Sequence, residues 1–409
     1  MLGYTASSTN NALLIFADIV DSSVHSSFLG TMKFANKVLK FQELFRTLGR
    51  SYFYNKTKFD KRIDSLCIID SRGDEGHVFI VDPEQKADEL VLRGVKFALE
   101  LKARQKILNL KEEDLPPKEM KIAIGIHYGE VALVTTTEEK EGIFRTLIDR
   151  IMGYSINYAK RVESSSRIGR FSQVFLSKEA ANLLSYSPVA LFKHETSLKG
   201  IESRDEVYEV RSAFLDEVPA SVANDAGGIS NEQFVNHFDR NYKEIEFLRE
   251  PWLKSFVLSI LNAQWEATKG TEKEKEYFDK ISKIAWHKPI EDDPLMLFWR
   301  ARECEESNKY SRAVKCLKDI LKKYPYFIHA RIKIIDTCFK MVRSEDKTSS
   351  ELIFVRDTAE EMLEKYKGLL AETEKNRLEE ILQQMDIDRK KEKKKKRKRN
   401  SIFFPFKEK

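Results

Sequence analysis

The stretch "LLIFADIVDSS", residues 13–23, contains the strand on which the predicted fold is built. An apolar run extends from Leu13 to Ala17 and is followed by two acids, Asp18 and Asp21. A short apolar run with polar flanks predicts a buried β-strand. Carboxylates are costly inside a core strand, so the acids at its end suggest a functional site. The alternative is that both acids cap the helix that follows.

Strand and helix patterns alternate outward from this stretch as far as residue 213. After the first strand we predict helix 28–48, a hairpin over 65–82 around Gly73-Asp74, helix 87–107, a strand pair over 120–136 broken at Gly125 and Gly129, helix 152–164, strand 172–177, helix 178–185 and a closing strand 205–212. This order of strand, helix, hairpin, helix and strand is typical of an α+β domain with a ferredoxin-like plan.

The chain after residue 213 has a different pattern. A small, polar and glycine-containing stretch predicts a linker at 214–233. Residues 234–388 predict an all-α domain, in which "PLMLFWRARECEESNKYSRAVKCLKDILKKYPYF" resembles one tetratricopeptide helix pair by the placement of Ala301, Ala313, Leu317 and Pro325. Residues 389–409 predict a polybasic, disordered tail. The chain is therefore expected to have an α+β domain at 1–213 and an all-α domain at 234–388, in which one tetratricopeptide-like unit is clear.

Composition limits the setting of the protein. The formal net charge is +6, but the tail at 389–409 carries +10, which leaves −4 for the rest. The four cysteines form no metal-like or redox-like pair, and no apolar run reaches the roughly 20 residues of a membrane span. We expect a cytoplasmic protein. The tail is most simply a solvated terminus; alternatively it contacts anionic lipid at the inner face of the membrane, or nucleic acid.

Two acids suggest a metal site. Asp18 ends one strand and Asp74 lies in the hairpin turn, so adjacent central strands would bring them together. Two unpaired carboxylates repel, and a divalent ion such as Mg²⁺ removes that cost while also binding phosphate oxygens. Taken singly, Asp18 is better explained as a helix cap and Asp74 as a turn former.

A second pair of polar residues lies on the predicted helix 152–164. Asn157 and Arg161 are spaced i and i+4, so they share one face of the helix. An amide and a guanidinium that point together suit a sugar oxygen and a phosphate. The alternative is an ordinary solvated helix face.

Five segments in order resemble motifs of the class III nucleotidyl cyclases. The segments are "FADIVDSS" (first metal motif), "DSRGDEG" (second metal motif), "IAIGIHYGEVAL" (strand pair), "GYSINYAKRVES" (catalytic helix) and "SLKGIESRDEVYEV" (closing strand). Each is weak alone, but five in the right order over about 200 residues form a strong signal. The resemblance covers the N-terminal half only.

The resemblance implies a reaction and a set of roles. The ribose 3′-oxygen of a nucleoside triphosphate would attack its α-phosphorus, and pyrophosphate would leave, with two Mg²⁺ or Mn²⁺ ions per site. Family positions assign the metal ions to Asp18, Asp74 and the Ile19 carbonyl, the ribose to Asn157, the α-phosphate charge to Arg161 and the terminal phosphates to Lys199. Family sites form between two cyclase domains, so a homodimer is implied. Asp21, where the family has glycine, is expected to be a helix cap.

The base-reading positions of the family are occupied here by Asp70 and Arg150, whereas ATP cyclases have lysine and aspartate. An acid at 70 requires a ring N–H and a base at 150 requires a carbonyl oxygen, which uracil and guanine offer in that order. A mispaired buried polar group costs roughly 1–3 kcal/mol. The arrangement resembles the pyrimidine cyclases of bacterial anti-phage defence. We predict UTP first and GTP second; the alternative is that both residues form surface salt bridges.

Three functions remain open from the sequence. The first is a nucleotidyl cyclase that makes cyclic UMP in anti-phage signalling, or a guanylate or adenylate cyclase. The second is a catalytically inactive, nucleotide-binding sensor, and the third a helical scaffold with a dimerising α+β domain. The helical half would bind a protein partner, inhibit the enzyme or merely pack.

Overall fold

A computed structural model describes most of the chain. The described residues are 3–55, 59, 65–111, 119–140, 143–185, 187, 189–197, 204–213, 251–286, 294–324, 327–345, 349–365, 370, 372 and 374–387. The predicted linker at 214–233, the predicted tail at 389–409 and Lys199 lie outside the described residues. The chain divides into two compact units, residues 1–296 and 297–409.

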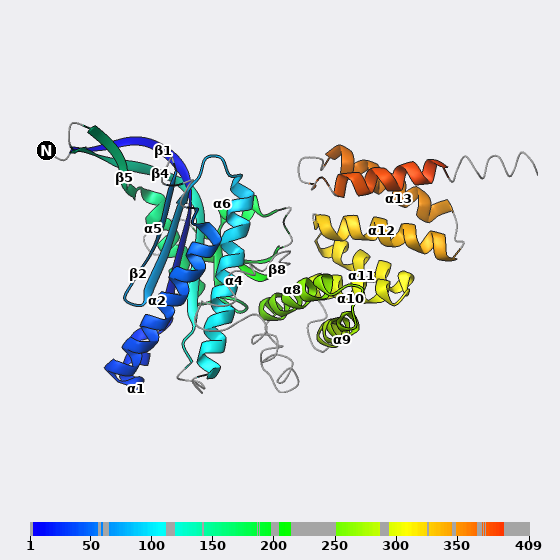
Figure 1. The fold of residues 1–409 in the computed structure, drawn as a ribbon, viewed down its shortest axis with the longest axis horizontal. Helices are drawn as coiled ribbons and strands as arrows, with labels where there is room; N and C mark the ends of the chain where they lie inside the picture. Colours follow the sequence, from blue (N-terminus) through cyan, green and yellow to red (C-terminus); the bar gives the residue numbers. More distant parts are fainter. Residues whose placement is uncertain are drawn as a thin grey trace, which may run out of the picture. The chain divides into compact units, whose positions relative to one another are not determined.

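The first unit is built on a mixed sheet of eight strands (Figure 1). Seven run in the order β2-β3-β1-β4-β6-β8-β7, and β5 pairs with β4 outside this path. The strands are β1 (Gly3–Ile19), β2 (Leu66–Arg72), β3 (Glu75–Val81), β4 (Ile122–Lys140), β5 (Ile143–Met152), β6 (Val174–Ser177), β7 (Val189–Ser197) and β8 (Arg204–Ala213). The helices that accompany the sheet are α1 (Ser22–Leu29), α2 (Thr31–Phe53), α4 (Ala87–Lys111), α5 (Tyr154–Ser166) and α6 (Lys178–Leu183).

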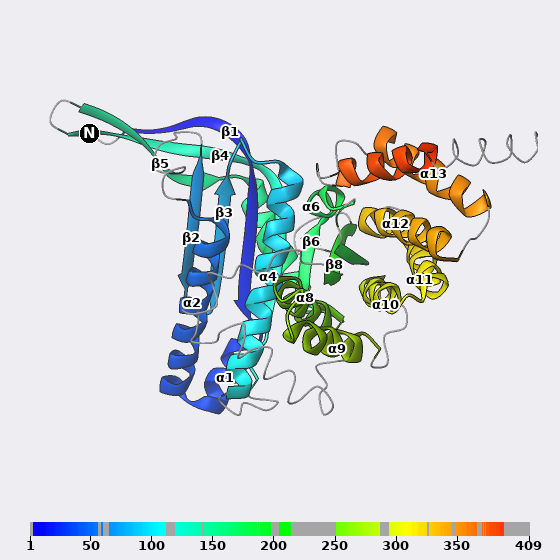
Figure 2. The ribbon, with the colours of Figure 1, turned by 45° about the vertical axis from the view of Figure 1, so that its right-hand side comes forward.

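Helices cover both faces of the central strands, and the side chains of β1 alternate between them. On one face, Leu13 and Ile15 approach Gly94 of α4. This helix lies beside α2 (Figures 1 and 2), with Phe45 of α2 and Phe97 of α4 at 5.4 Å between ring centroids. On the other face, a buried cluster joins the alternate residues of β1 to α5: Ala12, Leu14, Phe16, Phe79, Val81, Val131, Leu133, Ile151 and Ala159. A residue's position in β1 thus decides which helix it meets.

The α+β architecture predicted from the sequence is confirmed, with shifts in its elements. The hairpin and helix 87–107 form as β2, β3 and α4. The single helix expected at 28–48 is interrupted at Gly30, whose φ of +74° favours glycine, so that α1 and α2 are separate. The sequence reading missed β5 and β7, which follow no clear alternation of apolar and polar residues.

The strand pair expected around Gly125 and Gly129 is wrong, because both glycines lie inside the continuous strand β4. They are needed for close approach and not for a turn. A Cβ at Gly125 would lie 2.2 Å from the backbone nitrogen of Glu163, and one at Gly129 would lie 2.8 Å from Oγ of Ser155. Gly125 therefore lets the backbone of α5 rest directly on β4, and Gly129 leaves room for the side chains of His127 and Ser155.

The remaining helices follow the sheet along the chain. In the first unit, α8 (Pro251–Ala267) contacts β8 and α4, and α9 (Lys273–Trp286) packs on α8. The helix α10 (Pro294–Glu306) leads into the second unit, which contains α11 (Tyr310–Lys323), α12 (Ile328–Glu345), α13 (Ser349–Lys365) and a helical stretch at 374–387. The predicted all-α character of this half is confirmed. No helix in the described ranges combines the length and the hydropathy needed to cross a bilayer.

The two helices of the predicted pair form as α10 and α11. Asn308 adopts the left-handed conformation with φ of +57°, and the amide of Lys309 donates to the carbonyl of Cys304 at 2.7 Å. This arrangement ends α10 and lets α11 begin two residues later. Ala301, Ala313 and Leu317 are all buried, as a helix pair of the tetratricopeptide type requires.

The contact between β4 and α5 gives a testable prediction. Gly125→Ala should lower the free energy of unfolding by about 2 kcal/mol or more, because the new methyl group meets backbone atoms that have no rotamer to change. Gly94→Ala is the matched control, because its Cβ would meet only flexible ends of Leu13 and Ile15 at 3.3 Å or more. Urea unfolding of both variants is the measurement, and equal stability would contradict the close-approach argument.

Candidate active site

The sheet brings Asp18 and Asp74 together at the end of β1. Asp18 pairs in register with Glu75, the first residue of β3, so Asp74 lies one residue further along the turn. The backbone amide of Ile19 donates to the carbonyl of Asp74 at 3.1 Å. The proximity of the two acids, which the sequence predicted, is therefore a consequence of backbone pairing.

A tight turn positions Asp74. Gly73 has φ of +58° in the two-residue connection between β2 and β3, the backbone conformation that such a hairpin loop requires. Nε2 of Gln42, on α2, donates to the carbonyl of Gly73 at 2.7 Å. The turn is thus held from the helix on one side and from β1 on the other.

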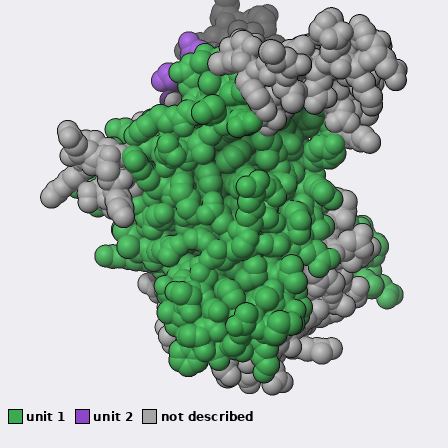
Figure 3. All heavy atoms as spheres, turned by 90° about the vertical axis from the view of Figure 1, so that its left-hand side faces the viewer, with its two compact units in different colours: residues 1–296 green, residues 297–409 purple. Residues whose placement is uncertain are grey.

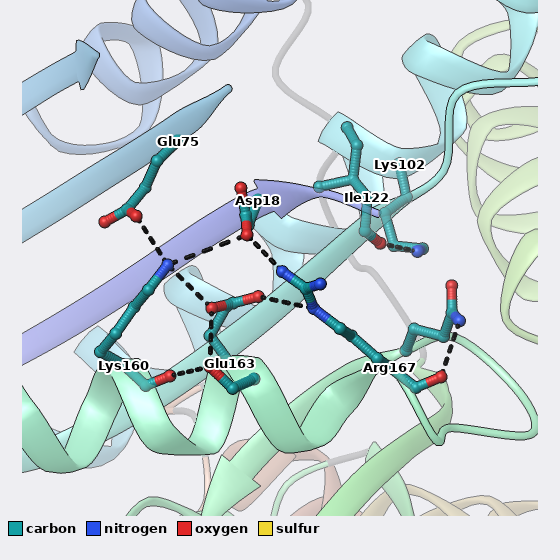
Figure 4. A network of polar contacts seen from close by, with 9 residues as sticks. Asp18, Glu75, Lys102, Ile122, Lys160, Glu163 and Arg167 are labelled. Atoms are coloured by element: carbon teal, nitrogen blue, oxygen red, sulfur yellow. Dashed lines mark hydrogen bonds and ion pairs between the residues drawn. The ribbon is translucent and has the colours of Figure 1, made fainter. Parts of the chain in front are cut away.

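Asp18 faces α5, because it continues the alternation of Leu14 and Phe16 on that side of β1. Figure 4 shows the contacts that it meets there. Nη2 of Arg167 lies 2.5 Å from Oδ2 of Asp18, and Nζ of Lys160 lies 3.9 Å from the same oxygen. Arg167 immediately follows α5, and Lys160 is in its middle. Asp18 is therefore paired with two cations from one helix region.

Lys160 joins three acids into one network (Figure 4). Its Nζ lies 2.6 Å from Oε2 of Glu75 and 2.9 Å from Oε2 of Glu163. The Glu163 side chain is fully buried, and its Oε1 has no hydrogen-bond partner; Nε of Arg167 lies 3.8 Å from that oxygen. Four acids and two bases meet here when Asp74 is included, so the acids exceed the bases by two charges.

Burial is the largest influence on the pKa values of Asp18 and Glu163 in this network. It raises the pKa of Asp18, with Asp74 and Glu75 adding to the effect and Lys160 and Arg167 opposing it. Burial likewise raises the pKa of Glu163, against the pull of Lys160. The pKa of Lys160 is raised although burial lowers it, because hydrogen bonds to Glu75 and Glu163 stabilise the ammonium ion. The acids are crowded, which a divalent ion would relieve.

The donor set fits a hard divalent cation. Asp18 and Asp74 offer carboxylate oxygens at one end of the sheet, and an excess of two negative charges remains after Lys160 and Arg167 are counted. Mg²⁺ accepts such a site, since it uses one or two carboxylates and completes its shell with water and phosphate. No group of three or more His, Cys, Asp or Glu side chains within the described ranges forms a cage that would hold a metal without a substrate.

Asn157 and Arg161 share one face of α5, as their spacing predicted, and this face lies opposite the buried side of the helix. Asn157 is exposed and Arg161 is partly buried. They lie roughly a quarter-turn around the helix from Lys160 and Arg167. In the described part of the chain neither side chain has a hydrogen bond or an ion pair, so this pair is not brought onto Asp18 and Asp74 of the same chain.

Asp70 and Arg150 are also not brought together within one chain. Asp70 of β2 pairs with His77 and lies 3.1 Å from Nε of Arg72 and 3.9 Å from Nε2 of His77. Arg150 is exposed on β5 and pairs with Val134, where the register with β4 shifts. Burial alone would raise the pKa of Asp70, but the Ser71 amide and Arg72 outweigh it and lower that pKa. Asp70 is thus a charged acceptor at neutral pH.

The part of the chain that contains these residues matches a known family of catalytic domains. The sequence model of the adenylate and guanylate cyclase catalytic domain matches residues 4–211, just over half of the chain. The chain belongs to this family. No curated protein matches the sequence.

Several solved structures are similar to the cyclase domain. The adenylyl cyclase CyaB from P. aeruginosa is 17% identical, with a TM-score of 0.39, and the match covers 52% of this chain and 98% of that one. The guanylyl cyclase Cya2 is 18% identical, with a TM-score of 0.37 and coverage of 51% and 95%. A class III adenylyl cyclase-like ATP-binding protein from Pseudomonas aeruginosa is 12% identical, with a TM-score of 0.28 and coverage of 84% and 73%.

The structure explains the departure of this cyclase at Asp21. Asp21 precedes α1 in the N-cap position, as expected, but its side chain makes no capping hydrogen bond. Its backbone has φ of +55° and ψ of +39°, the left-handed conformation that favours glycine and that aspartate tolerates better than most residues. Asp21 can stand where the family has glycine because aspartate tolerates this left-handed backbone conformation. The expectation that its side chain caps α1 is wrong.

The sequence reading missed the cations that meet Asp18. Lys160, Glu163 and Arg167 are spaced i, i+3 and i+7 and so form a charged stripe along one side of α5. Lys160 occupies the variable position between Ala159 and Arg161 of the cyclase motif, and Arg167 lies beyond it. The spacing of these three residues can be seen in the sequence. No local sequence pattern indicates that they face the strand of Asp18, about 140 residues earlier in the chain.

Proposed function

We propose that the protein is a class III nucleotidyl cyclase that converts a nucleoside triphosphate to a 3′,5′-cyclic nucleotide and pyrophosphate. The observation that carries the proposal is the placement of Asp18 beside Asp74 at the end of β1. The match to the cyclase catalytic domain supports it. The main competing function, a nucleotide-binding sensor without activity, is favoured by the two cations that already pair with Asp18.

In the proposed mechanism, Asp18, Asp74 and the Ile19 carbonyl would hold two Mg²⁺ or Mn²⁺ ions. Bound there, the ions would lower the pKa of the ribose 3′-hydroxyl and neutralise phosphate charge. The residues of this chain do the positioning. Asn157 would orient the ribose through its amide, Arg161 would stabilise the charge that builds on the α-phosphate, and Lys199 would meet the terminal phosphates.

We further propose that the active enzyme is a homodimer in which each site takes its acids from one protomer and Asn157 and Arg161 from the other. The outward position of Asn157 and Arg161 on α5 supports this, because their own Asp18 is paired inside the chain. The side chains of Met152 and Tyr154, next to them, are 57% and 62% exposed, which is unusual for large apolar residues and suits a protein contact. Figure 3 shows the side of the first unit on which α5 and β5 lie in Figure 1.

For the substrate we propose UTP, with GTP second. Asp70 supports this choice, since a charged carboxylate only accepts hydrogen bonds and therefore suits the N3–H of uracil or the N1–H of guanine. Arg150 would donate to the adjacent carbonyl oxygen. Cyclic UMP production would place the enzyme in bacterial anti-phage signalling, the setting that these two residues suggest. Cyclic GMP or cyclic AMP production would indicate general second-messenger signalling.

The helical half and the tail complete the proposal. The second unit would bind a protein partner or restrain the cyclase, since helix pairs of its type commonly bind peptides. The protein would be cytoplasmic, with the basic tail at 389–409 making weak contact with anionic lipid at the inner face of the membrane.

Removing Asp18 tests the activity. Asp18→Asn should abolish cyclic nucleotide production, with a loss of at least about a thousandfold in kcat/KM, because the proposed metal site loses the charge of one of its two carboxylates. Asp21→Asn is the matched control: it removes a nearby charge, keeps a residue that tolerates the left-handed conformation and should retain activity. Chromatographic detection of product with Mn²⁺ is the measurement. Unchanged activity in Asp18→Asn would exclude the proposed mechanism.

Mixing two inactive variants tests the homodimer. Asp18→Asn and Asn157→Ala each inactivate both sites of their own dimer. Subunit exchange at equal amounts should restore about a quarter of wild-type activity, because half of the dimers are mixed and each of these holds one intact site. Asp18→Asn mixed with Asp74→Asn is the control, since both changes affect the same protomer's contribution and no intact site forms. Equal recovery in both mixtures, or none in either, would contradict the shared site.

The base is tested by assaying UTP, GTP, CTP and ATP separately at equal concentration. The wild type should prefer UTP by roughly ten- to a hundredfold over ATP and CTP, which is the range that 1–3 kcal/mol per mispaired group gives. The double variant Asp70→Lys with Arg150→Asp restores the order of ATP cyclases and should shift preference toward ATP. Cyclic AMP as the sole product of the wild type would contradict the uracil argument.

A further inference from the structure

The pairing of Asp18 with Arg167 raises a question for any metal that binds Asp18. The guanidinium lies 2.5 Å from Oδ2 of Asp18, a charge-assisted contact on a side chain that is only 12% exposed. A divalent ion bound to this carboxylate and the Arg167 guanidinium would be two positive charges on one small group, and each would weaken the hold of the other. Binding of the ion therefore favours an arrangement in which Arg167 has moved away from Asp18.

The two cations of the network are not equally held. Nζ of Lys160 has two acids within 2.9 Å, Glu75 and Glu163, and lies further from Asp18 at 3.9 Å. Arg167 has its one close contact with Asp18, and its side chain is 41% exposed. Within the described ranges its other acid is Glu163, with Nε 3.8 Å from Oε1. Arg167 is therefore the cation that can leave Asp18 at lower cost.

Glu163 offers the place to which Arg167 can move. Its side chain is completely buried, and among the described residues Oε1 has no hydrogen-bond partner. A buried carboxylate oxygen without a donor is costly, so a guanidinium that shifts from Asp18 onto this oxygen gains a contact as it loses one. Figure 4 shows Arg167 between the two acids.

We propose that Arg167 is a displaceable counter-ion of Asp18: it occupies the carboxylate in the metal-free protein and moves onto Glu163 when a divalent ion binds. This inference rests on the proposed function, because it assigns Asp18 to the metal. Arg167 thereby weakens metal binding in the absence of substrate and keeps the crowded acids compensated. Since coupling is reciprocal, the metal weakens the bond of Arg167 to Asp18 by the same factor. Arg167 is a positioning residue in this scheme and touches no substrate.

The test is Mn²⁺ binding to the full chain without nucleotide, measured as free Mn²⁺ by electron paramagnetic resonance. Arg167→Gln should bind Mn²⁺ about tenfold more tightly than wild type, because the competing charge is gone. Arg167→Lys keeps a charge on a shorter, less directional group and should fall between the two. Arg170→Gln is the matched control: it removes an exposed arginine three residues away and should leave the affinity unchanged. Equal or weaker binding in Arg167→Gln than in wild type overturns the proposal.

A second measurement follows the wild-type protein itself and uses a variant only to assign one resonance. The Nε–H resonance of Arg167 is assigned by its absence in Arg167→Lys and followed while diamagnetic Mg²⁺ is added. We expect it to move as the site saturates, whereas an unmoved resonance at saturating Mg²⁺ overturns the proposal. Failure here is distinguishable from failure of the proposed function: Asp18→Asn would still abolish product. Conversely, product formation by Asp18→Asn would remove the proposed function even if Arg167 responded to metal.

Discussion

The structure depends on the antiparallel pairing of β1 between β3 and β4. Backbone hydrogen bonds fix the register of β1 against both neighbours, Asp18 opposite Glu75 on one side and Ala123 on the other. Because side chains alternate with a period of two, this register sends Leu13 and Ile15 toward α4 and Leu14, Phe16 and Asp18 toward α5. A slip by one residue would bury Asp18 under α4, away from every cation of α5. The site is thus set by the same pairing that builds the core.

The charges around Asp18 show how a crowded group of buried acids is compensated within the protein. Bringing Asp18, Asp74, Glu75 and Glu163 into one region would be prohibitive if none were compensated. Lys160 and Arg167 supply two positive charges from one side of α5, and they leave two negative charges over. Glycine at 125 permits this, because α5 can rest on β4 only where no Cβ intervenes. Core packing and site electrostatics therefore depend on the same helix–strand contact.

Much of this arrangement was predictable from sequence, and the failures have physical causes. The proximity of Asp18 and Asp74 could be predicted because a strand end and a hairpin turn are local features that one pairing joins. The role of Gly125 could not, since a glycine needed for close approach has the same local pattern as one needed for a turn. Asp21 shows the reverse case: its side chain suggested a cap, and the conformation of its backbone decides its role. The contact between Arg167 and Asp18 joins residues 149 apart in sequence, and no local periodicity of the sequence predicts such a contact.

The positions of Asp70 and Arg150 constrain how a base would be read. Asp70 lies on the α5 side of the sheet, since it pairs with His77, whose ring lies 6.1 Å from that of Phe16. Arg150 follows the opposite alternation, because its neighbour Ile151 belongs to the cluster under α5. The two side chains therefore reach one base only if the arm formed by β4 and β5 twists enough to turn Arg150 toward the substrate, or if a second protomer supplies one of them. In the proposed homodimer the second case would make base selection depend on both protomers, whereas Asp18 and Asp74 are brought together at the end of β1 within one chain.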